Sequence, residues 1–346
     1  MIRLLIATDA WRPQVNGVVR SIERMAEELP CLGAKVAIMS PGMFRTVPLP
    51  TYPEIRLALA RPSTIGARVE AMEPDAIHIA TEGPIGLAVR RWCLRNRRRF
   101  TTAYHSRFPE YVRKRFPVPL RFTYAMLRGF HNSGNGCMVS TRSLRRDLES
   151  RGFRNLMDWG RGVDAHLFRP RPGASLGLPK PVFLYVGRVA VEKNLDAFLG
   201  LDLPGSKVVV GDGPDLARLK ARFPAAHFPG VKSGEVLAET YAAADVFVFP
   251  SRTDTFGMVL LEALACGVPV AAYPVAGPLD VIGDAPVGVL SEDLRAAALD
   301  ALDVPRERCR TFALEHSWPA SARQFIDNVI AGQGDEMPRL VLEPQT

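Results

Sequence analysis

The sequence contains no long run of apolar residues, although 47% of its 346 residues are hydrophobic. A helix that crosses a bilayer needs about 18–20 consecutive apolar residues, and no stretch of the chain approaches that length. The opening residues, Met1–Asp9, turn polar too soon for a signal peptide and favour a buried first strand. These features argue against a protein anchored by spanning helices, and we expect a cytoplasmic chain.

Cysteine is scarce as well. The five cysteines, at positions 31, 93, 137, 266 and 309, are odd in number, widely scattered and without a Cys-x-x-Cys pair. This pattern argues for reduced thiols and against a disulfide framework or a zinc site. The sequence also lacks an Asp-x-Asp triplet and any cluster of His and Asp at metal-ligand spacing. We therefore expect neither a bound metal nor another cofactor.

Short apolar runs alternate with helical patterns along the chain. The predicted strands are residues 3–8, 35–39, 55–59, 75–80, 100–105 and 136–140, then 182–186, 207–210, 245–250 and 268–273. Predicted helices between the earlier strands include residues 18–29, 84–96 and 141–151. This alternation predicts an α/β protein with doubly wound parallel sheets, and the length favours two domains.

A Pro/Gly-rich passage over residues 169–181 predicts a linker between the two domains. We expect two Rossmann-like domains around a hinge near 170–180, with ligands in the interdomain cleft where the carboxyl ends of both sheets face each other. The predicted domains are residues 1–170 and 171–315. Residues 316–346 follow, with a last helix over 318–330 that returns to the first domain and a loosely held polar tail.

Positive charge is concentrated in one segment of the predicted first domain. Between Arg90 and Arg128 the sequence has twelve Lys or Arg residues and one acid, Glu110, a net charge of +11, whereas the whole chain carries +8. Eight aromatic residues lie in the same segment. Such a segment attracts anionic lipid surfaces or nucleic acid, and otherwise forms a solvated basic face.

One charged side chain, Glu262, interrupts the apolar run from Phe256 to Val270. Apolar stretches on both sides predict two buried strands, so the helix between them packs against a sheet. An ionised carboxylate is costly there unless something binds it. Asp254 lies eight residues earlier, in a loop that also contains Gly257 and leads to the helix N-terminus. The pattern predicts a polar, phosphate-bearing ligand where strand meets helix; a surface Glu on an amphipathic helix is the alternative.

This segment resembles the Glu-x7-Glu signature of retaining nucleotide-sugar glycosyltransferases with the GT-B fold, a family that includes mannosyl-, glucosyl- and galactosyltransferases. The resemblance implies that Glu262 holds the ribose hydroxyls of the donor. Asp254, together with the loop amides of Phe256 and Gly257, would hold hydroxyls of the donor sugar. Asp254 departs from the family, because Glu is usual at that position.

Two further segments in the first half resemble motifs of the same family. Gly17, which follows the first predicted strand within Asn16-Gly17-Val18, matches a Gly-rich loop that reaches the donor diphosphate and lines the acceptor site. An ordinary Asn-Gly turn is the alternative reading. His105 ends the fifth predicted strand, and the resemblance implies contact between its imidazole and the transferred sugar. A structural histidine is the alternative there.

In the second half, Gly187-Arg188 followed by Glu192-Lys193 resembles the family's Gly-Arg…Glu-Lys motif. Two cations beside a helix N-terminus suit a pyrophosphate. Charge grows on that group as the sugar–phosphate bond breaks, so Arg188 and Lys193 would stabilise the transition state. A metal ion is then unnecessary. The catalytic candidates are therefore His105, Arg188 and Lys193, and the resemblance implies same-face attack with retention of configuration.

The basic segment gives an expectation for the acceptor. We expect a peripheral protein at the inner face of the membrane that moves a hexose or hexuronic acid from a UDP- or GDP-linked sugar to a lipid such as diacylglycerol. The expected acceptor and membrane patch consists of Arg91, Arg95, Arg97, Arg98, Arg99, Arg113, Lys114 and Arg115. Segments around residues 13–18 and 104–111 look most like bacterial mannosyl- and glycolipid-forming members.

Three alternatives remain from the sequence. One is a GDP-mannose-dependent mannosyltransferase, or another glycosyltransferase with a soluble or polysaccharide acceptor. The second is a nucleic-acid-binding protein, which leaves Glu262 and Lys193 without a role and shows no readable binding module. The third is a GT-B relative that is not a transferase, such as a sugar-nucleotide epimerase. Base, sugar, linkage and oligomeric state are left open.

Overall fold

The computed structural model describes residues 1–14, 17–49, 52–59, 61–105, 108–115, 118–252 and 256–334, with backbone alone at 49, 52–55, 111–112 and 114–115. The chain divides into two compact units. Unit 1 comprises Met1–Gly160 and Trp318–Thr346, and unit 2 comprises Arg161–Ser317. The predicted α/β class with two Rossmann-like units is confirmed, because each unit is built on one parallel six-stranded sheet.

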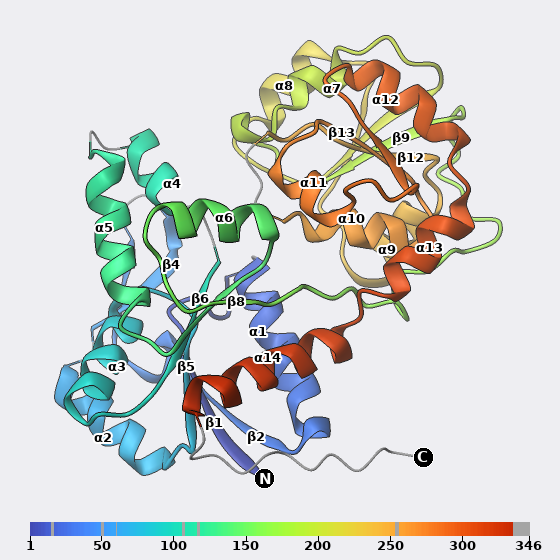
Figure 1. Ribbon diagram of the computed structural model, residues 1–346. Helices are drawn as coiled ribbons and strands as arrows, with labels where there is room; N and C mark the ends of the chain where they lie inside the picture. The colour runs from blue at the N-terminus through green and yellow to red at the C-terminus, as the bar shows by residue number, and fades with distance from the viewer. Residues whose placement is uncertain are drawn as a thin grey trace, which may run out of the picture. The chain divides into compact units, whose positions relative to one another are not determined.

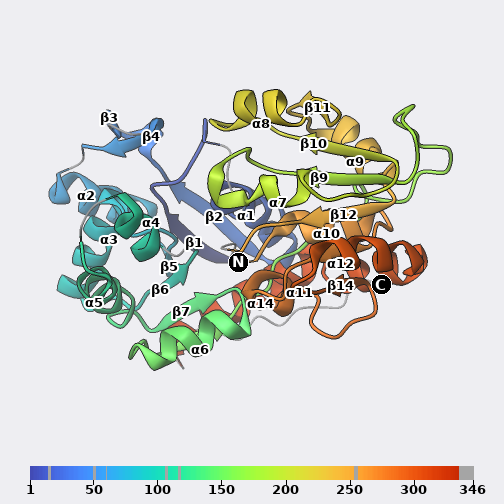
Figure 2. The same cartoon turned by 90° about the horizontal axis from the view of Figure 1, so that it is seen from above.

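The sheet of unit 1 has the strand order β2-β1-β5-β6-β7-β8, and its neighbouring strands pair in parallel (Figure 2). Its strands are β1 Ile2–Ala7, β2 Ala34–Met39, β5 Ala76–Ile79, β6 Thr101–Tyr104, β7 Gly136–Val139 and β8 Leu156–Asp158. The order changes direction between β1 and β5, so the loops after these two strands diverge at the carboxyl edge. Ligands of open α/β sheets bind at such a point.

Helices cover both faces of this sheet. They are α1 Gly17–Glu28, α2 Pro62–Met72, α3 Pro84–Arg95, α4 Phe108–Arg115, α5 Leu120–His131, α6 Arg142–Ser150 and α14 Trp318–Gln333. Apolar residues of α2 and α3 pack with Leu5, Ile77 and Ile79 in one core cluster. Those of α5 and α6 pack around Tyr104 and Val139 in another.

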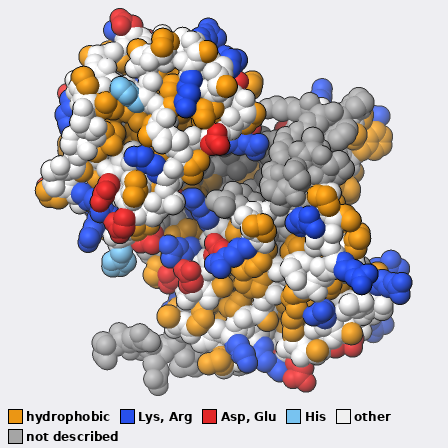
Figure 3. Space-filling model, turned by 180° about the vertical axis from the view of Figure 1, so that it is seen from behind, with side chains coloured by type: hydrophobic (Ala, Val, Ile, Leu, Met, Phe, Trp, Pro, Cys, Tyr) orange, Lys and Arg blue, Asp and Glu red, His pale blue; other side chains and the backbone are white. Residues whose placement is uncertain are grey.

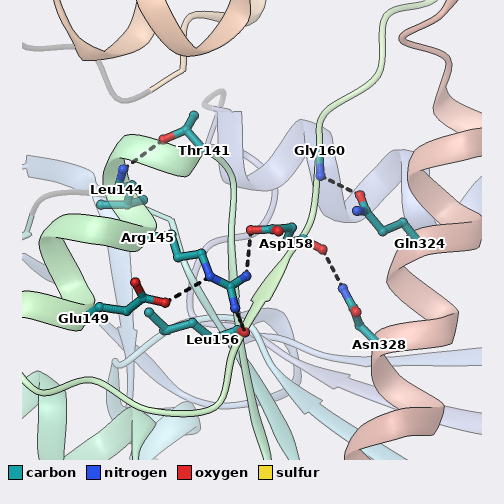
Figure 4. Close-up of polar contacts among 9 residues, drawn as sticks. All are labelled: Thr141, Leu144, Arg145, Glu149, Leu156, Asp158, Gly160, Gln324 and Asn328. Atoms are coloured by element: carbon teal, nitrogen blue, oxygen red, sulfur yellow. Dashed lines mark hydrogen bonds and ion pairs between the residues drawn. The ribbon is translucent and has the colours of Figure 1, made fainter.

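The last helix, α14, completes unit 1. Its Gln324 side chain accepts a hydrogen bond from the Gly160 amide (2.8 Å), and Asn328 donates to the Asp158 carbonyl (2.8 Å; Figure 4). Arg145 of α6 holds the same strand from the other side, through the Asp158 carboxylate and the Leu156 carbonyl. Strand β8 is therefore fixed between two helices.

The sheet of unit 2 has the order β11-β10-β9-β12-β13-β14, again parallel. Its strands are β9 Val182–Val186, β10 Ser206–Val210, β11 His227–Gly230, β12 Val246–Phe249, β13 Val270–Ala272 and β14 Gly288–Leu290. Its helices are α7 Leu195–Leu199, α8 Leu216–Arg222, α9 Gly234–Ala242, α10 Met258–Ala265, α11 Ala276–Val281, α12 Leu294–Asp300 and α13 Arg306–Leu314.

Alternation along β9 shows how this sheet is buried on both faces. Val182, Leu184 and Val186 point to the core formed with α9, α10 and α13. Phe183 and Tyr185 point to the core formed with α7, α8 and α12. Figure 1 shows these two sets of helices on opposite sides of the sheet. Two covered faces explain why the strands read as continuous apolar runs.

The structure differs from the sequence predictions in three respects. The predicted strand at 55–59 falls in β4 (Tyr52–Ala58), which pairs antiparallel with β3 (Thr46–Leu49) in a separate hairpin rather than in the parallel sheet. Strands β3, β8, β11 and β14 were not predicted. The expected hinge near 170–180 lies inside unit 2, because Leu176 and Leu178 pack against its core and the unit begins at Arg161.

Candidate functional site

Arg188 and Lys193 lie on the loop that leaves β9 at the carboxyl edge of the unit 2 sheet. Arg188 is exposed and Lys193 is partly buried at the end of the short 3-10 helix η3, Val191–Lys193. Asn194 follows in the left-handed region, with φ of 55°, and its side chain donates to the Pro250 carbonyl (3.1 Å). Because Pro250 follows β12, this bond ties the cationic loop to the end of the neighbouring strand.

The backbones of the loops that follow β9 and β10 approach each other closely at Gly187 and Gly211. A Cβ atom on Gly211, whose φ is +144°, would lie 1.9 Å from the Gly187 carbonyl oxygen. The loops after β9 and β10 are also joined by a hydrogen bond from the Val189 amide to the Asp212 carbonyl (2.9 Å). Only glycine fits at position 211 while the loop that contains Arg188 keeps this conformation.

Glu262 lies in the second turn of α10, between β12 and β13, and only 6% of its surface is exposed. The hydroxyl of Tyr241, from α9, donates to its Oε2 at 2.9 Å. One oxygen is thus oriented by a neighbouring helix. Cys266, one turn later, stays a thiol, because burial and the nearby Glu262 raise its pKa to about 12.

Gly257, which has a φ of +80°, directly precedes α10 as the residue that caps its N-terminus. A Cβ there would press on Leu260 and Phe249, within 3.3 Å of each. Phe256 and Gly257 are both partly exposed, so the amides assigned to the donor sugar lie at the surface of unit 2. Asp254, the other predicted sugar ligand, lies outside the described residues.

A second polar group at this edge was not predicted. The guanidinium of Arg252, after β12, lies 3.7 Å from the ring centroid of Tyr273, after β13, and pairs with Glu292 (2.8 Å), after β14. The bond to Glu292 raises the pKa of Arg252. The common signal in the sequence is position, because each residue follows the end of a strand.

In unit 1, Gly17 is the exposed first residue of α1, and a Cβ there would meet nothing within 4 Å. His105 follows β6 and is partly buried, with its ring edge-on to Trp159 at a centroid distance of 5.8 Å. Trp159 is in turn held by a hydrogen bond from its indole nitrogen to Ser321 of α14 (3.1 Å).

Asp9, at the end of β1, is buried, and sequence reasoning missed it. Its carboxylate accepts hydrogen bonds from the amides of Ile85 (2.8 Å) and Gly86 (3.2 Å) and from the Thr81 hydroxyl (3.0 Å). Burial raises the pKa of Asp9, and these bonds oppose that rise. Asp9 therefore occupies the N-terminus of α3 and completes its first turn.

The predicted basic patch is largely exposed. Arg91 and Arg95 lie on the outer face of α3, Arg97–Arg99 follow that helix, and Arg113 lies on α4. Arg98 also donates to the Pro74 carbonyl (2.6 Å). The side chains of Lys114 and Arg115 lie outside the described residues. Figure 3 shows Lys and Arg side chains gathered at one edge of unit 1.

Large apolar side chains are exposed on α3 and on α5. Leu87 and Leu94 of α3 are 50% and 47% exposed, and Phe122 and Met126 of α5 are 58% and 57% exposed. Their spacing places Leu87 with Leu94 on one face of α3, and Phe122 with Met126 on one face of α5. Arg90 joins the two helices, because it donates to the Gly129 carbonyl (3.1 Å).

The described part of the chain has neither a cluster of metal ligands nor a helix that could span a membrane. Within those residues, no three His, Cys, Asp or Glu side chains are grouped closely enough to hold a metal ion. Among the helices described, none combines the length and apolar character needed to cross a membrane.

Comparison with known families accounts for both units. The family described as "Glycosyltransferase Family 4" matches residues 15–167, and "Glycosyl transferases group 1" matches residues 173–302. The chain belongs to these glycosyltransferases. The fold agrees: the crystal structure of Anabaena Alr3699/HepE in complex with UDP and glucose superposes with a TM-score of 0.71 at 14% identity, covering 96% of this chain and 100% of that one. The glycosyltransferase is a hexosyltransferase with the GT-B fold.

Two relatives match the glycosyltransferase over nearly its whole length. The GDP-mannose-dependent alpha-mannosyltransferase of Mycobacterium tuberculosis is 29% identical over 96% of this chain and 97% of its own. The alpha-monoglucosyldiacylglycerol synthase of Streptococcus pneumoniae is 26% identical over 94% of this chain and 83% of its own.

Proposed function

We propose that this glycosyltransferase moves a hexose or hexuronic acid from a UDP- or GDP-linked sugar to a membrane lipid such as diacylglycerol. The observation that carries the lipid assignment is the joint exposure of arginine and large apolar side chains on α3 and α5 of unit 1. Arginine attracts anionic headgroups, and exposed Phe, Leu and Met can enter the interface between headgroups and acyl chains. A relative named for diacylglycerol supports the same acceptor class.

On the donor side, the proposal assigns the ribose to Glu262 and the diphosphate to Arg188 and Lys193. A buried carboxylate oriented by Tyr241 suits a pair of ribose hydroxyls, because charge-assisted hydrogen bonds are the stronger kind. The cationic loop is fixed to the end of β12 through Asn194, so its charges need little rearrangement as the diphosphate leaves. The reaction would need no metal and would retain the anomeric configuration, the leaving phosphate helping to take the acceptor proton.

A mannosyltransferase with a soluble acceptor is the second candidate. The match to a GDP-mannose-dependent alpha-mannosyltransferase, over 96% of this chain, favours it. The two candidate functions share the donor site and differ in the acceptor that unit 1 binds, a membrane lipid or a soluble molecule. The acceptor experiment therefore separates them.

The test measures binding to vesicles and sugar transfer together. Wild-type protein should sediment with vesicles that contain dioleoylphosphatidylserine, but not with phosphatidylcholine alone, and binding should fall as salt screens the charges. Changing Arg91, Arg95 and Arg97 to Glu should remove about 3 kcal/mol of attraction. That is a loss of at least about a hundredfold in partitioning.

A charge-matched control reverses three exposed cations elsewhere, Lys35, Lys220 and Arg308. This control should bind vesicles as wild type does. Transfer from labelled UDP-glucose or GDP-mannose to dioleoylglycerol should fall only in the first variant, while donor hydrolysis by water is kept in both. A wild-type protein that ignores anionic vesicles but glycosylates a soluble sugar at full rate would refute the lipid acceptor and favour the second candidate.

A further inference from the structure

Glu82 lies beyond the carboxyl end of β5, and His105 lies beyond that of the neighbouring strand β6. Strands β5 and β6 pair with His78 opposite Thr101 and Ile79 opposite Thr102. In sequence, Glu82 comes three residues after Ile79 and His105 three residues after Thr102, so both follow the last paired residues of these two strands. The segments that follow β1 and β5 also stay close together, because the Asp9 amide donates to the Thr81 hydroxyl (2.6 Å).

A buried histidine holds the Glu82 carboxylate. The Nε2 atom of His131, on α5, lies 2.9 Å from Glu82 Oε1, and its Nδ1 atom lies 2.9 Å from the Thr102 hydroxyl. The His131 side chain is fully buried, whereas the Glu82 side chain is 26% exposed. The imidazole is therefore anchored inside unit 1, and the carboxylate it holds reaches the surface.

The surroundings of His131 favour the protonated, positively charged form of its imidazole. Burial alone lowers the pKa of His131, but Cys137 and Glu82 outweigh burial and raise it. A charged imidazole orients the carboxylate more firmly than a neutral one, because the hydrogen bond is then charge-assisted.

Glu82 is available for a ligand in a way that its neighbour Asp9 is not. The Asp9 carboxylate already accepts bonds from Ile85, Gly86 and Thr81. Glu82 Oε2 has no hydrogen-bond partner among the residues that the structure describes. A carboxylate with one oxygen held and the other unpartnered among the described residues, at the same sheet edge as His105, is chemically suited to accept a hydrogen bond from a hydroxyl group.

We propose that Glu82 binds a hydroxyl group of the acceptor through Oε2, and that His131 and Thr102 are positioning residues for this carboxylate. The proposal rests on the proposed function and specifies its substrate class. Two carboxylates, Glu82 and Asp9, lie together at this edge and repel anions. The acceptor should therefore present a neutral hydroxyl, as the glycerol of diacylglycerol does, rather than a phosphate ester.

The test compares Glu82→Gln with Glu149→Gln, a control that removes the charge of another unit 1 glutamate, one that pairs with Arg145. Glu82→Gln should raise the KM for dioleoylglycerol about tenfold, because a charge-assisted bond becomes a neutral one. Donor affinity and donor hydrolysis without acceptor should stay near wild type, and any fall in Tm should shrink as pH rises. The control should change none of these. Thr102→Val, one step further away, should raise the acceptor KM by a smaller factor.

The outcomes separate this proposal from the proposed function. If wild-type protein glycosylates methyl α-mannoside but not dioleoylglycerol, the lipid acceptor is wrong, and a raised KM for methyl α-mannoside in Glu82→Gln still supports the acceptor role of Glu82. An unchanged acceptor KM refutes that role. So does a parallel loss of Tm, donor affinity and acceptor affinity, which indicates a structural pair, and so does a wild-type enzyme that uses neither neutral acceptor.

Discussion

The variant Glu262→Gln tests whether the Glu262 carboxylate binds a ligand or stabilises the fold. Glu262→Gln preserves side-chain volume and lets the amide oxygen still accept the Tyr241 hydrogen bond, which is 2.9 Å long in the wild type. The change removes the charge from a side chain that is only 6% exposed. Burial disfavours the charged form of a carboxyl group, so the free energy of unfolding should stay constant or rise by about 1 kcal/mol.

Donor binding should move in the opposite direction. Hydrogen bonds to a charged group contribute about 1.5–3 kcal/mol, against about 0.5–1.5 kcal/mol for neutral ones. Losing that difference at two ribose hydroxyls predicts a Kd for the nucleotide sugar that is roughly 10- to 100-fold higher. Isothermal calorimetry with UDP-glucose and GDP-mannose measures the Kd, and urea unfolding measures stability.

The companion variant Tyr241→Phe removes the orienting hydroxyl and leaves the charge in place. It should weaken donor binding by less than Glu262→Gln does, and it should lower stability by about 1 kcal/mol. If Glu262→Gln unfolds more easily than wild type while donor affinity stays the same, Glu262 serves the fold and the assignment of the ribose site is refuted.

Two other predictions concern the reaction and pH. Arg188→Ala and Lys193→Ala should each lower kcat more than they raise the Kd for the donor, since charge develops on the leaving diphosphate; EDTA should leave wild-type activity intact, and inhibition that Mg²⁺ restores would contradict the metal-free reaction. The pKa of His131 is raised from 6.5 to about 10 by Cys137 and Glu82 against burial, so its contribution to stability is fully present below about pH 6.5 and is lost as pH rises toward the folded value. The gap in unfolding free energy between wild type and Glu82→Gln should therefore be largest near pH 6 and close by pH 10, and a gap that widens with pH in urea melts would refute the charged pair.

Helices and strands that are determined by their own residues could be predicted from short stretches of the sequence. The apolar run broken by Glu262 predicted a helix between two strands, and α10 lies between β12 and β13 as expected. Strands of five or six apolar residues, such as β1 and β9, were readable for the same reason. Edge strand β11 was missed because it is four residues long, contains Pro229 and alternates exposed with partly buried residues, which no short window separates from a loop.

Features that depend on distant pairing were out of reach. The run at residues 55–59 is extended as predicted, but nothing in its own sequence shows that its partner is β3 rather than the parallel sheet. The pairs Asp9–Ile85 and Glu82–His131 join residues 76 and 49 positions apart. Each member reads alone as an ordinary loop acid or helix residue. Only the fold shows that one acid completes a helix and the other reaches the surface.

The interrupted course of unit 1 has a consequence for synthesis. Strands β1 to β8 leave the ribosome first, yet the helix that covers them, α14, begins at Trp318, after all of unit 2. Phe325 and Ile326 of that helix are 1% and 0% exposed in the finished protein, and Trp159 relies on Ser321 for its hydrogen bond. Unit 2 can therefore fold before unit 1 is complete. Until α14 has been synthesised, unit 1 has an apolar face uncovered. We expect the nascent chain to be most prone to aggregation during that interval, because apolar surface is then exposed.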